Sequence, residues 1–343
     1  MFSKSRTVLV VLAMVALAAP AAAAEPERSW LISPATEEGM VDGRPFFTYT
    51  LDPGDTVTDY LRVKSFADAT QTLTLYPSEA GNAANGDLVL ADGAAQPKDL
   101  SAWTSLDVQA LELPPNGEQL VRIDIQVPPE AEPGDYTQGI VTSQTQQVKQ
   151  EDGQLVNLDT RLAARVYVRV NGELAPQVEF TGLTDSYERE WWNPFGTAEL
   201  SYSVQNTGNV RLRASDAVTV EGPFGIDLGG PEAGPEILDL LPGSEVVSQP
   251  IAIPRVFALL QLTQTVELSP YAVNQGDLPV APVEASSTAW AVYWPAVALL
   301  ALGLLVFLLL WRRRRRLSKL AKVHGQLVVH ATGTTSGSTA VSS

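Results

Sequence analysis

The chain has 343 residues, of which 45% are hydrophobic and 18% are charged, with no cysteine and two histidines. Its formal net charge is -16, and all 39 acidic residues lie between Glu25 and Glu284, a stretch that holds only 14 of the 23 basic residues. Such an acidic surface repels phosphates, which excludes a nucleic-acid partner. The lack of cysteine excludes thiolate chemistry and disulfides, so stability has to come from buried cores of ordinary size.

The first 24 residues have the pattern of a cleavable secretory signal peptide. "MFSKSR" is a short basic region, an apolar run follows it, and Ala22 and Ala24 supply the small residues of a cleavage site. No cysteine follows the run, so a lipoprotein anchor is excluded. We predict that residues 1–24 are removed and that the mature chain begins near Glu25.

Residues 25–174 are predicted to form an Ig-like β-sandwich domain. Apolar residues recur at every second position in several stretches, which is typical of half-buried antiparallel strands. Turn signals such as "DPGD" and "EPGD" separate these stretches. The prolines and glycine of "VPPEAEPGDYTQGIV" favour a corner between two strands, with Tyr136 packed near the bend. The alternating stretches are residues 46–51, 56–66, 71–80, 119–128, 136–146 and 160–170.

Residues 175–285 are predicted to form a second Ig-like β domain after a short polar break. "AELSYSVQNTGNVRL" at 198–212 indicates a strand, an Asn-Thr-Gly-Asn turn and another strand. "LTQTVELSPYAV" at 262–273 indicates a further strand. Residues 286–290 are expected to be a tether between this domain and the membrane.

Residues 291–311 form a run without charge that is long enough to span a bilayer, about 31 Å as a helix. Aromatic residues near its ends, Trp290, Tyr293, Trp294 and Trp311, lie where interfacial aromatic belts lie. The arginines at 312–316 place that end in the cytoplasm by the positive-inside rule. The sequence therefore predicts a single-pass plasma-membrane protein with its bulk outside the cell and a basic, disordered cytoplasmic tail over 312–343.

The composition of the outer segment restricts its chemistry. Both histidines, His324 and His330, lie in the predicted tail, so the outer segment has neither histidine nor cysteine. Ser-His-Asp catalysis, Cys-His catalysis and histidine-ligated zinc are excluded there. A glycosidase-type carboxylate pair remains formally possible, but the acids fall in turns and at solvent-facing strand positions. We therefore expect a non-enzymatic protein with no catalytic residue, no cofactor and no metal site.

Two segments are candidates for ligand recognition. Residues 79–103, rich in Gly, Asn and Ala, form a long excursion between strands in which "NGD" predicts a hairpin turn. "WWNPFG" at 191–196 brings together three aromatics that either stack on a sugar or a partner, or pack between the two domains. The candidate ligand-binding residues are Asn82, Asn85, Asp87, Trp103, Trp191 and Trp192.

The order of three stretches resembles the peptidoglycan-binding domain of the WxL-interacting proteins of Gram-positive bacteria. These are "FTYTLDPGDTVTDYLRVKSFADATQTLTLYPSEAGNAANGDL", "LELPPNGEQLVRIDIQVPPEAEPGDYTQGIVTSQ" and "RLAARVYVRVNGEL". The likeness rests on a Pro-Gly turn before a strand, an Ala/Asn/Gly-rich loop, and a proline-rich bend ending in Gly134 and Tyr136. It covers residues 30–174, and the plan of signal peptide, two β domains, one span and basic tail is similar too.

This resemblance implies a non-enzymatic, membrane-anchored cell-surface protein that binds the peptidoglycan of the cell wall and contacts surface proteins. The second domain departs from the partner-binding region typical of that family, so no ligand residue is carried over. A second function class stays open: a structural or accessory subunit of a membrane secretion or transport assembly, without affinity for glycan.

Overall fold

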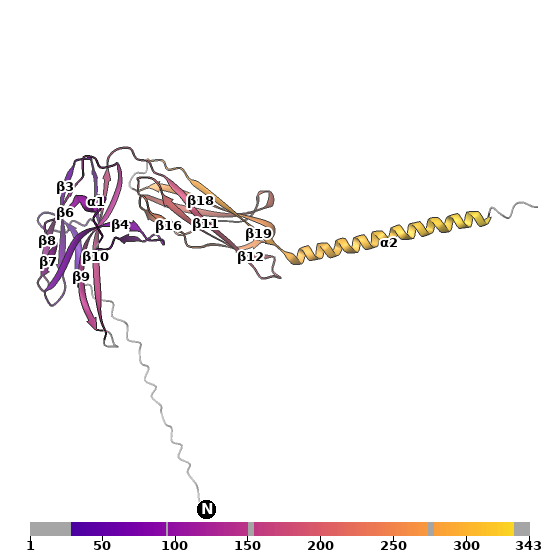
Figure 1. Ribbon diagram of the computed structural model, residues 1–343, viewed down its shortest axis with the longest axis horizontal. Coiled ribbons are helices and arrows are strands. Elements are labelled where there is room, and N and C mark those ends of the chain that lie inside the picture. Colours follow the sequence, from indigo (N-terminus) through magenta and orange to yellow (C-terminus); the bar gives the residue numbers. More distant parts are fainter. Residues whose placement is uncertain (1–28, 94, 150–153, 274–277, 333–343) are drawn as a thin grey trace, which may run out of the picture.

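The computed structural model describes residues 29–93, 95–149, 154–273 and 278–332, and the predicted signal peptide lies outside these ranges. Two β-sandwiches follow one another along the chain, and a long helix extends from the far end of the second sandwich (Figure 1). This arrangement confirms the predicted all-β class with one apolar helix near the C-terminus.

The first sandwich consists of two facing sheets. One has the strand order β1-β3-β8-β6, and the other has the order β2-β10-β9-β4-β5, with β7 also paired to β4. All neighbours are antiparallel except β2 and β10. The elements are β1 (Trp30–Ala35), β2 (Phe47–Leu51), β3 (Thr56–Ser65), β4 (Gln71–Asn82), β5 (Leu88–Leu90), α1 (Asp99–Trp103), β6 (Thr104–Leu106), β7 (Ala110–Leu113), β8 (Glu118–Gln126), β9 (Gly134–Lys149) and β10 (Leu155–Val170).

The core of the first sandwich is built from the predicted alternation. Val121, Ile123 and Ile125 of β8 are at most 2% exposed, because side chains two apart lie on the same face of a strand. Burying each such side chain contributes about 1.5–3 kcal/mol. Trp30 lies between the sheets at 1% exposure, and its indole N–H donates to Oγ1 of Thr142 at 2.8 Å. The polar edge of this large ring is therefore satisfied inside the core.

The second sandwich also consists of two sheets. One has the order β11-β12-β16, with β17 also on β12, and the other has the order β14-β13-β18-β19, with β15 on β13. Leu200, Val204 and Leu262 are among its fully buried core side chains. The elements are β11 (Val178–Glu188), β12 (Phe195–Asn206), β13 (Leu212–Gly222), the 3-10 turn η1 (Pro223–Gly225), β14 (Ile226–Glu232), β15 (Ile237–Leu240), β16 (Glu245–Val247), β17 (Ile251–Phe257), β18 (Leu259–Ala272) and β19 (Val283–Val292).

The predicted Asn-Thr-Gly-Asn turn joins β12 to β13 and depends on a buried amide. Asn206 is 0% exposed, and its Nδ2 donates to the carbonyl oxygens of Val210 at 2.8 Å and Leu240 at 3.0 Å. Its Oδ1 accepts the N–H of Gly208 at 3.0 Å. A Cβ atom on Gly208 would lie 2.3 Å from the carbonyl oxygen of Ala175, so only glycine fits there.

The proline-rich bend between β8 and β9 joins the two sandwiches. Tyr136 packs at the bend as the sequence predicts, and its hydroxyl donates to the carbonyl oxygen of Glu132 at 2.9 Å. Gly134 has a φ of 147°, and a Cβ atom on it would lie 2.7 Å from the carbonyl oxygen of Asn209 in the second sandwich. The next residue, Asp135, donates its N–H to that same oxygen at 2.8 Å. The predicted corner is therefore also the junction between the sandwiches.

Asp135 carries further contacts across this junction. The Nε and Nη2 atoms of Arg169 donate to its two carboxylate oxygens, both at 2.6 Å. The N–H of Arg211, in the second sandwich, donates to Oδ2 of Asp135 at 2.7 Å. The guanidinium of Arg211 lies 3.8 Å from the ring centroid of Tyr167 in β10. Charge-assisted hydrogen bonds and a cation–π contact thus hold the two sandwiches together.

The predicted tether at 286–290 is wrong, because these residues lie inside β19. This strand pairs with β18 along its whole length, from Val283 opposite Leu268 to Val292 opposite Leu259. Its inward positions are Val283, Ala285, Ser287, Ala289 and Ala291, so small and polar residues hide the alternation of a strand. The helix α2 (Trp294–Thr332) follows after a single residue.

α2 also corrects the limits of the predicted span and tail. The helix begins at Trp294 rather than at 291, because Ala291 and Val292 still pair with β18. It continues to Thr332, so disorder over the whole of 312–343 is wrong: 312–332 are helical, in a stretch rich in Leu, Lys, Arg and Ala, which favour helices. Among the described residues, one helix is long and apolar enough to cross a membrane, Trp294–Arg315, with 22 residues and a mean hydropathy of 2.4.

Candidate functional site

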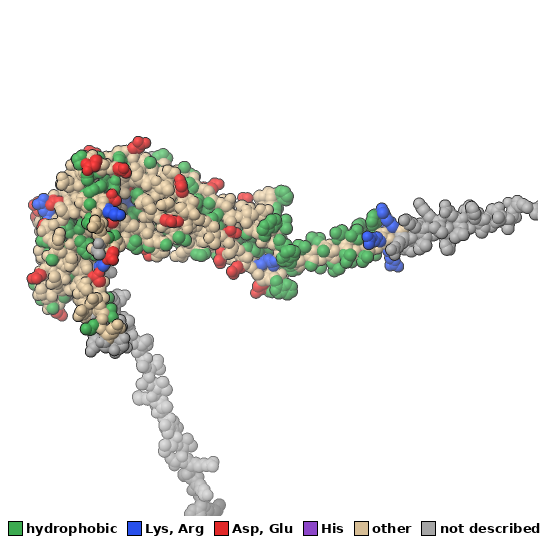
Figure 2. Space-filling model, in the orientation of Figure 1, with side chains coloured by type: hydrophobic (Ala, Val, Ile, Leu, Met, Phe, Trp, Pro, Cys, Tyr) green, Lys and Arg blue, Asp and Glu red, His purple; other side chains and the backbone are tan. Residues whose placement is uncertain are grey.

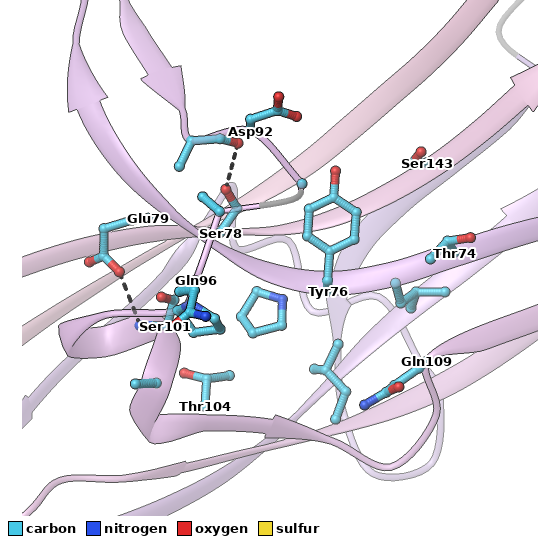
Figure 3. Close-up of a pocket in the computed structure, with 18 of the residues that line it drawn as sticks. Thr74, Tyr76, Ser78, Glu79, Asp92, Gln96, Ser101, Thr104, Gln109 and Ser143 are labelled. Carbon is cyan, nitrogen blue, oxygen red and sulfur yellow. Dashed lines mark hydrogen bonds between the residues drawn. The ribbon is translucent and has the colours of Figure 1, made fainter. Parts of the chain in front are cut away.

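A pocket with a volume of about 710 Å³ lies on the first sandwich, beside β4 (Figure 3). Its floor comes from the outward face of β4, where Thr74, Tyr76 and Ser78 alternate with the buried leucines of the core face. Residues 91–93 and 95–97, with the second half of α1 and β6, form the opposite side. The pocket thus exists because the segment between β5 and β6 folds back over the outer face of its own sheet.

The ring of Tyr76 forms the aromatic wall of this pocket (Figure 3). The side chain is half-buried, and burial raises the pKa of its hydroxyl. Gly93 passes so close that a Cβ atom there would lie 2.8 Å from the hydroxyl oxygen of Tyr76. Pro77 and Pro97 add apolar surface to the lining. A flat ring with apolar neighbours is the kind of wall on which a sugar face stacks.

Hydrogen bonds fix the segment that covers β4. The hydroxyl of Ser78 donates to the carbonyl oxygen of Ala91 at 3.0 Å, and Oε2 of Glu79 accepts the N–H of Ser101 at 3.3 Å. Burial raises the pKa of Glu79, although the hydrogen bonds from Ser101 oppose that shift. At the base, Nε2 of the fully buried Gln138 donates to Oγ1 of Thr104 at 2.6 Å. The pocket is therefore largely preformed.

Polar and charged side chains line the rim. Gln96 and Gln109 are exposed and line the pocket. Arg161 of β10 also lines it, and its guanidinium lies 2.6 Å from Asp159 and 3.5 Å from Asp92. A hydrogen bond from Ser143, followed by one from Arg161, lowers the pKa of Asp159. Glu79 and Asp92 also line the pocket, so its described lining holds no unpaired cation for an anionic group, and its amides and hydroxyls around an aromatic wall suit an uncharged, polyhydroxylated ligand.

Asn82, a predicted ligand residue, is engaged by the second sandwich and does not line the pocket. Its Nδ2 donates to the carbonyl oxygen of Asp239 at 2.6 Å, and its Oδ1 accepts the N–H of Leu241 at 2.9 Å. The neighbouring carbonyl oxygen of Ala84 accepts the N–H of Val247 at 2.7 Å. The β4–β5 hairpin therefore reaches across to the second sandwich, and Asn82 satisfies its backbone groups.

Asn85 and Asp87 lie at the exposed tip of the same hairpin, outside the pocket lining. Nδ2 of Asn85 donates to Oδ2 of Asp87 at 2.7 Å, and the N–H of Asp87 donates back to Oδ1 of Asn85 at 3.2 Å. The N–H of Ala83 donates to the carbonyl oxygen of Asp87 at 2.8 Å, which confirms the predicted hairpin turn. A ligand at this tip stays a prediction.

Trp103, at the end of α1, is half-buried and packs against Tyr136, with ring centroids 4.7 Å apart. It covers one end of the first core rather than the pocket. Trp191 and Trp192 lie in the turn between β11 and β12, with 77% and 58% of their surfaces exposed. This turn is at the end of the second sandwich next to α2, away from the first sandwich, so packing between the domains is excluded (Figure 1).

The structure therefore spreads the six predicted residues over three places and puts none of them in the pocket beside β4. The residues that sequence reasoning missed are Tyr76, Gln96 and Arg161. One signal was present in the sequence: Tyr76 is an aromatic on the face of β4 opposite the leucines, next to the long excursion at 79–103. An outward-facing aromatic beside a long loop is a reason to expect a binding surface.

Comparisons with known proteins leave the family open. No protein-family model matches the chain, and no curated protein matches it in sequence. Among solved structures, it is similar to a chain of a chaperone–tip adhesin complex of CFA/I fimbriae, with 13% identity, a TM-score of 0.37, and 75% of this chain and 98% of that chain covered. The class 5 fimbrial chaperone CfaA is 12% identical with a TM-score of 0.35, and the match covers 75% of this chain and 98% of that chain. The Pseudomonas aeruginosa CupB2 chaperone is 12% identical with a TM-score of 0.30, and the match covers 73% of this chain and 99% of that chain. All three TM-scores are below 0.5, so these similarities carry no argument about function.

Proposed function

We propose that this protein is a membrane-anchored cell-surface protein whose first sandwich binds the glycan of the cell wall. The observation that carries the proposal is the pocket beside β4, which is lined by the ring of Tyr76 together with the amides of Gln96 and Gln109. Its volume of about 710 Å³ lies in the range of about 300–1,000 Å³ that small-molecule sites occupy. Stacking on the ring and hydrogen bonds from amides and hydroxyls suit a sugar unit.

A further point supports peptidoglycan as the glycan. The sequence resemblance to the peptidoglycan-binding domain of WxL-interacting proteins covers residues 30–174, the part of the chain that carries the pocket. A binding role also fits an outer segment that has neither cysteine nor histidine.

The anchor in this proposal is α2. Its 22-residue candidate span, Trp294–Arg315, is about 33 Å long, and the part without charge, 294–311, is about 27 Å long, close to the hydrocarbon core of a bilayer of about 30 Å. By the positive-inside rule, the arginines at its end favour a cytoplasmic position for that side, and both sandwiches are then outside the cell. Surface proteins are further candidate partners of these sandwiches.

The test is sedimentation of the full chain, in a mild non-ionic detergent, with purified peptidoglycan. Tyr76→Ala removes the aromatic wall and is expected to weaken binding about 10- to 150-fold, since burial of such a ring is worth about 1.5–3 kcal/mol. Asn85→Ala is the comparison, because the hairpin tip outside the pocket is the other predicted ligand position on this sandwich; it is expected to bind like the wild type if the pocket is the site. Circular dichroism checks that both variants are folded.

The salt dependence gives a second readout. Because the outer segment and the wall polymers are both negatively charged, raised salt is expected to strengthen binding or to leave it unchanged. If the wild-type chain stays in the supernatant at every salt concentration, the glycan proposal fails and the accessory subunit of a secretion or transport assembly replaces it. If Tyr76→Ala binds as well as Asn85→Ala, the pocket is not the site.

A further inference from the structure

Exposed aromatic side chains gather where the second sandwich meets α2 (Figure 2). Four indoles contribute: Trp191 is 77% exposed, Trp192 58%, Trp290 73% and Trp294 67%. They come from the β11–β12 turn, the end of β19 and the first residue of α2. Residues about a hundred positions apart in the sequence thus form one apolar end of the molecule, here called the aromatic end.

The β11–β12 turn is fixed to the start of α2. Nη2 of Arg189 donates to the carbonyl oxygen of Val292 at 2.6 Å, and its guanidinium lies 5.5 Å from the ring centroid of Tyr293. The hydroxyl of Tyr293 donates to the carbonyl oxygen of Trp192 at 3.0 Å. These contacts tie the turn to the residue that precedes the helix, so the two tryptophans of the turn have a set position relative to α2.

No linker separates the second sandwich from α2. Strand β19 pairs with β18 up to Val292, and α2 begins at Trp294. When the apolar part of α2 lies in a bilayer, the aromatic end is therefore held at the bilayer surface. Tryptophan prefers this interface, because its ring is apolar and its N–H finds polar partners among the headgroups.

The charges around the turn argue against an anionic partner. Glu188 and Glu190 are exposed beside Arg189, whose guanidinium is engaged by backbone carbonyl groups. The turn therefore offers no basic patch for anionic headgroups, and its apolar surface is the indole rings. A glycan ligand for these rings is less favoured, because they lie at the opposite end of the second sandwich from the pocket-bearing domain (Figure 1).

We propose that Trp191 and Trp192 insert into the outer interface of the same bilayer that α2 spans. With Trp290 and Trp294 they hold the second sandwich against the membrane, so the turn acts as a second, shallow anchor. The inference rests on the proposed membrane anchor, α2, but not on glycan binding.

The chain lacks cysteine, so single cysteines can carry an environment-sensitive fluorophore. The full chain is reconstituted into phosphatidylcholine vesicles with the label at Trp192→Cys. Asn85→Cys, in an exposed turn of the first sandwich, is the matched control, and Leu304→Cys, in the middle of the candidate span Trp294–Arg315, reports the span. Quenching is measured with lipids that carry a nitroxide either close to the headgroup or close to the end of the acyl chain.

The label at position 192 is expected to be quenched more by the shallow nitroxide, since interfacial side chains lie about 5–10 Å into the headgroup boundary. The label at 304 is expected to show the reverse order, and the label at 85 no quenching. If the label at position 192 shows no quenching, like the label at 85, while the label at 304 is quenched, the inference is overturned and the span stands. If 304 is not quenched, the membrane anchor itself fails, and the shallow anchor fails with it.

A measurement without a dye completes the test. The tryptophan emission that is lost in the double variant Trp191→Phe, Trp192→Phe comes from the turn itself. In the full chain this part of the emission is expected to be quenched when the vesicles contain brominated acyl chains. If this part of the emission is equal with and without bromine, the inference is overturned. It is also overturned if soluble peptidoglycan fragments quench this emission and brominated lipids do not, because the turn would then bind a glycan.

Discussion

Replacing Asp135 by alanine is expected to destabilise the full chain by about 3–5 kcal/mol, the usual cost of removing one partner of a buried ion pair. The side chains of Arg169 and Asp135 are only 12% and 10% exposed, and two hydrogen bonds of 2.6 Å join them. The variant leaves the Arg169 guanidinium without its carboxylate. It also removes the acceptor of the Arg211 N–H, which lies in the second sandwich. Both losses fall on the junction, so the two sandwiches should unfold less cooperatively.

The measurement is urea unfolding of the full chain in non-ionic detergent, followed by tryptophan fluorescence. Asp124→Ala is the matched control, because Asp124 also pairs with an arginine in the first sandwich, Arg122, at 2.9 Å. Those side chains are 31% and 52% exposed, so we expect a loss of about 0–1 kcal/mol. If Asp135→Ala loses no more stability than Asp124→Ala, the junction does not depend on this carboxylate and the reasoning is refuted.

Three other outcomes follow from the structure. Burial raises the pKa of Glu79, so ionisation of this carboxyl opposes folding. The wild type should therefore lose stability relative to Glu79→Gln as the pH rises above 4.5, whereas the urea midpoints of the two proteins should coincide below that pH. An outer fragment that ends at Glu284 should melt at a lower temperature than one that ends at Val292, because it lacks most of β19, and circular dichroism should show both to be rich in β-structure. Protease added to wall-stripped cells should destroy both sandwiches but spare an epitope after Arg316; the opposite result would reverse the proposed orientation.

The strands that the sequence predicts well are those with large residues on the inward face. Leu61 and Val63 of β3, and Ile123 and Ile125 of β8, are buried and alternate with other residues. Large apolar residues at every second position are the pattern from which a strand is predicted. β11 was not predicted, because a bulge between Phe180 and Gly182 shifts its register and interrupts the period of two. β19 was not predicted because its inward side chains are mostly alanine and serine.

The pocket depends on tertiary contacts that no local pattern contains. The predicted excursion at 79–103 is a real feature, but the sequence does not say which part of it faces β4 and which part reaches the second sandwich. Asn82 was predicted to bind a ligand because amides do so, yet its partners are backbone groups of Asp239 and Leu241, far along the chain. The position of Trp191 beside α2 is likewise set by long-range contacts, through Arg189.

The direct passage from β19 into α2 makes the second sandwich a rigid spacer. Its strand β18 has 14 residues, roughly 45 Å at about 3.3 Å per residue. The first sandwich is fixed at the far end of this spacer by the junction at Asp135 (Figure 1). In the proposed orientation, the pocket beside β4 therefore samples a narrow layer above the lipid instead of the broad volume that a flexible tether would allow. Glycan strands in that layer meet a high local concentration of pockets, whereas strands lying closer to the lipid or farther from it meet none.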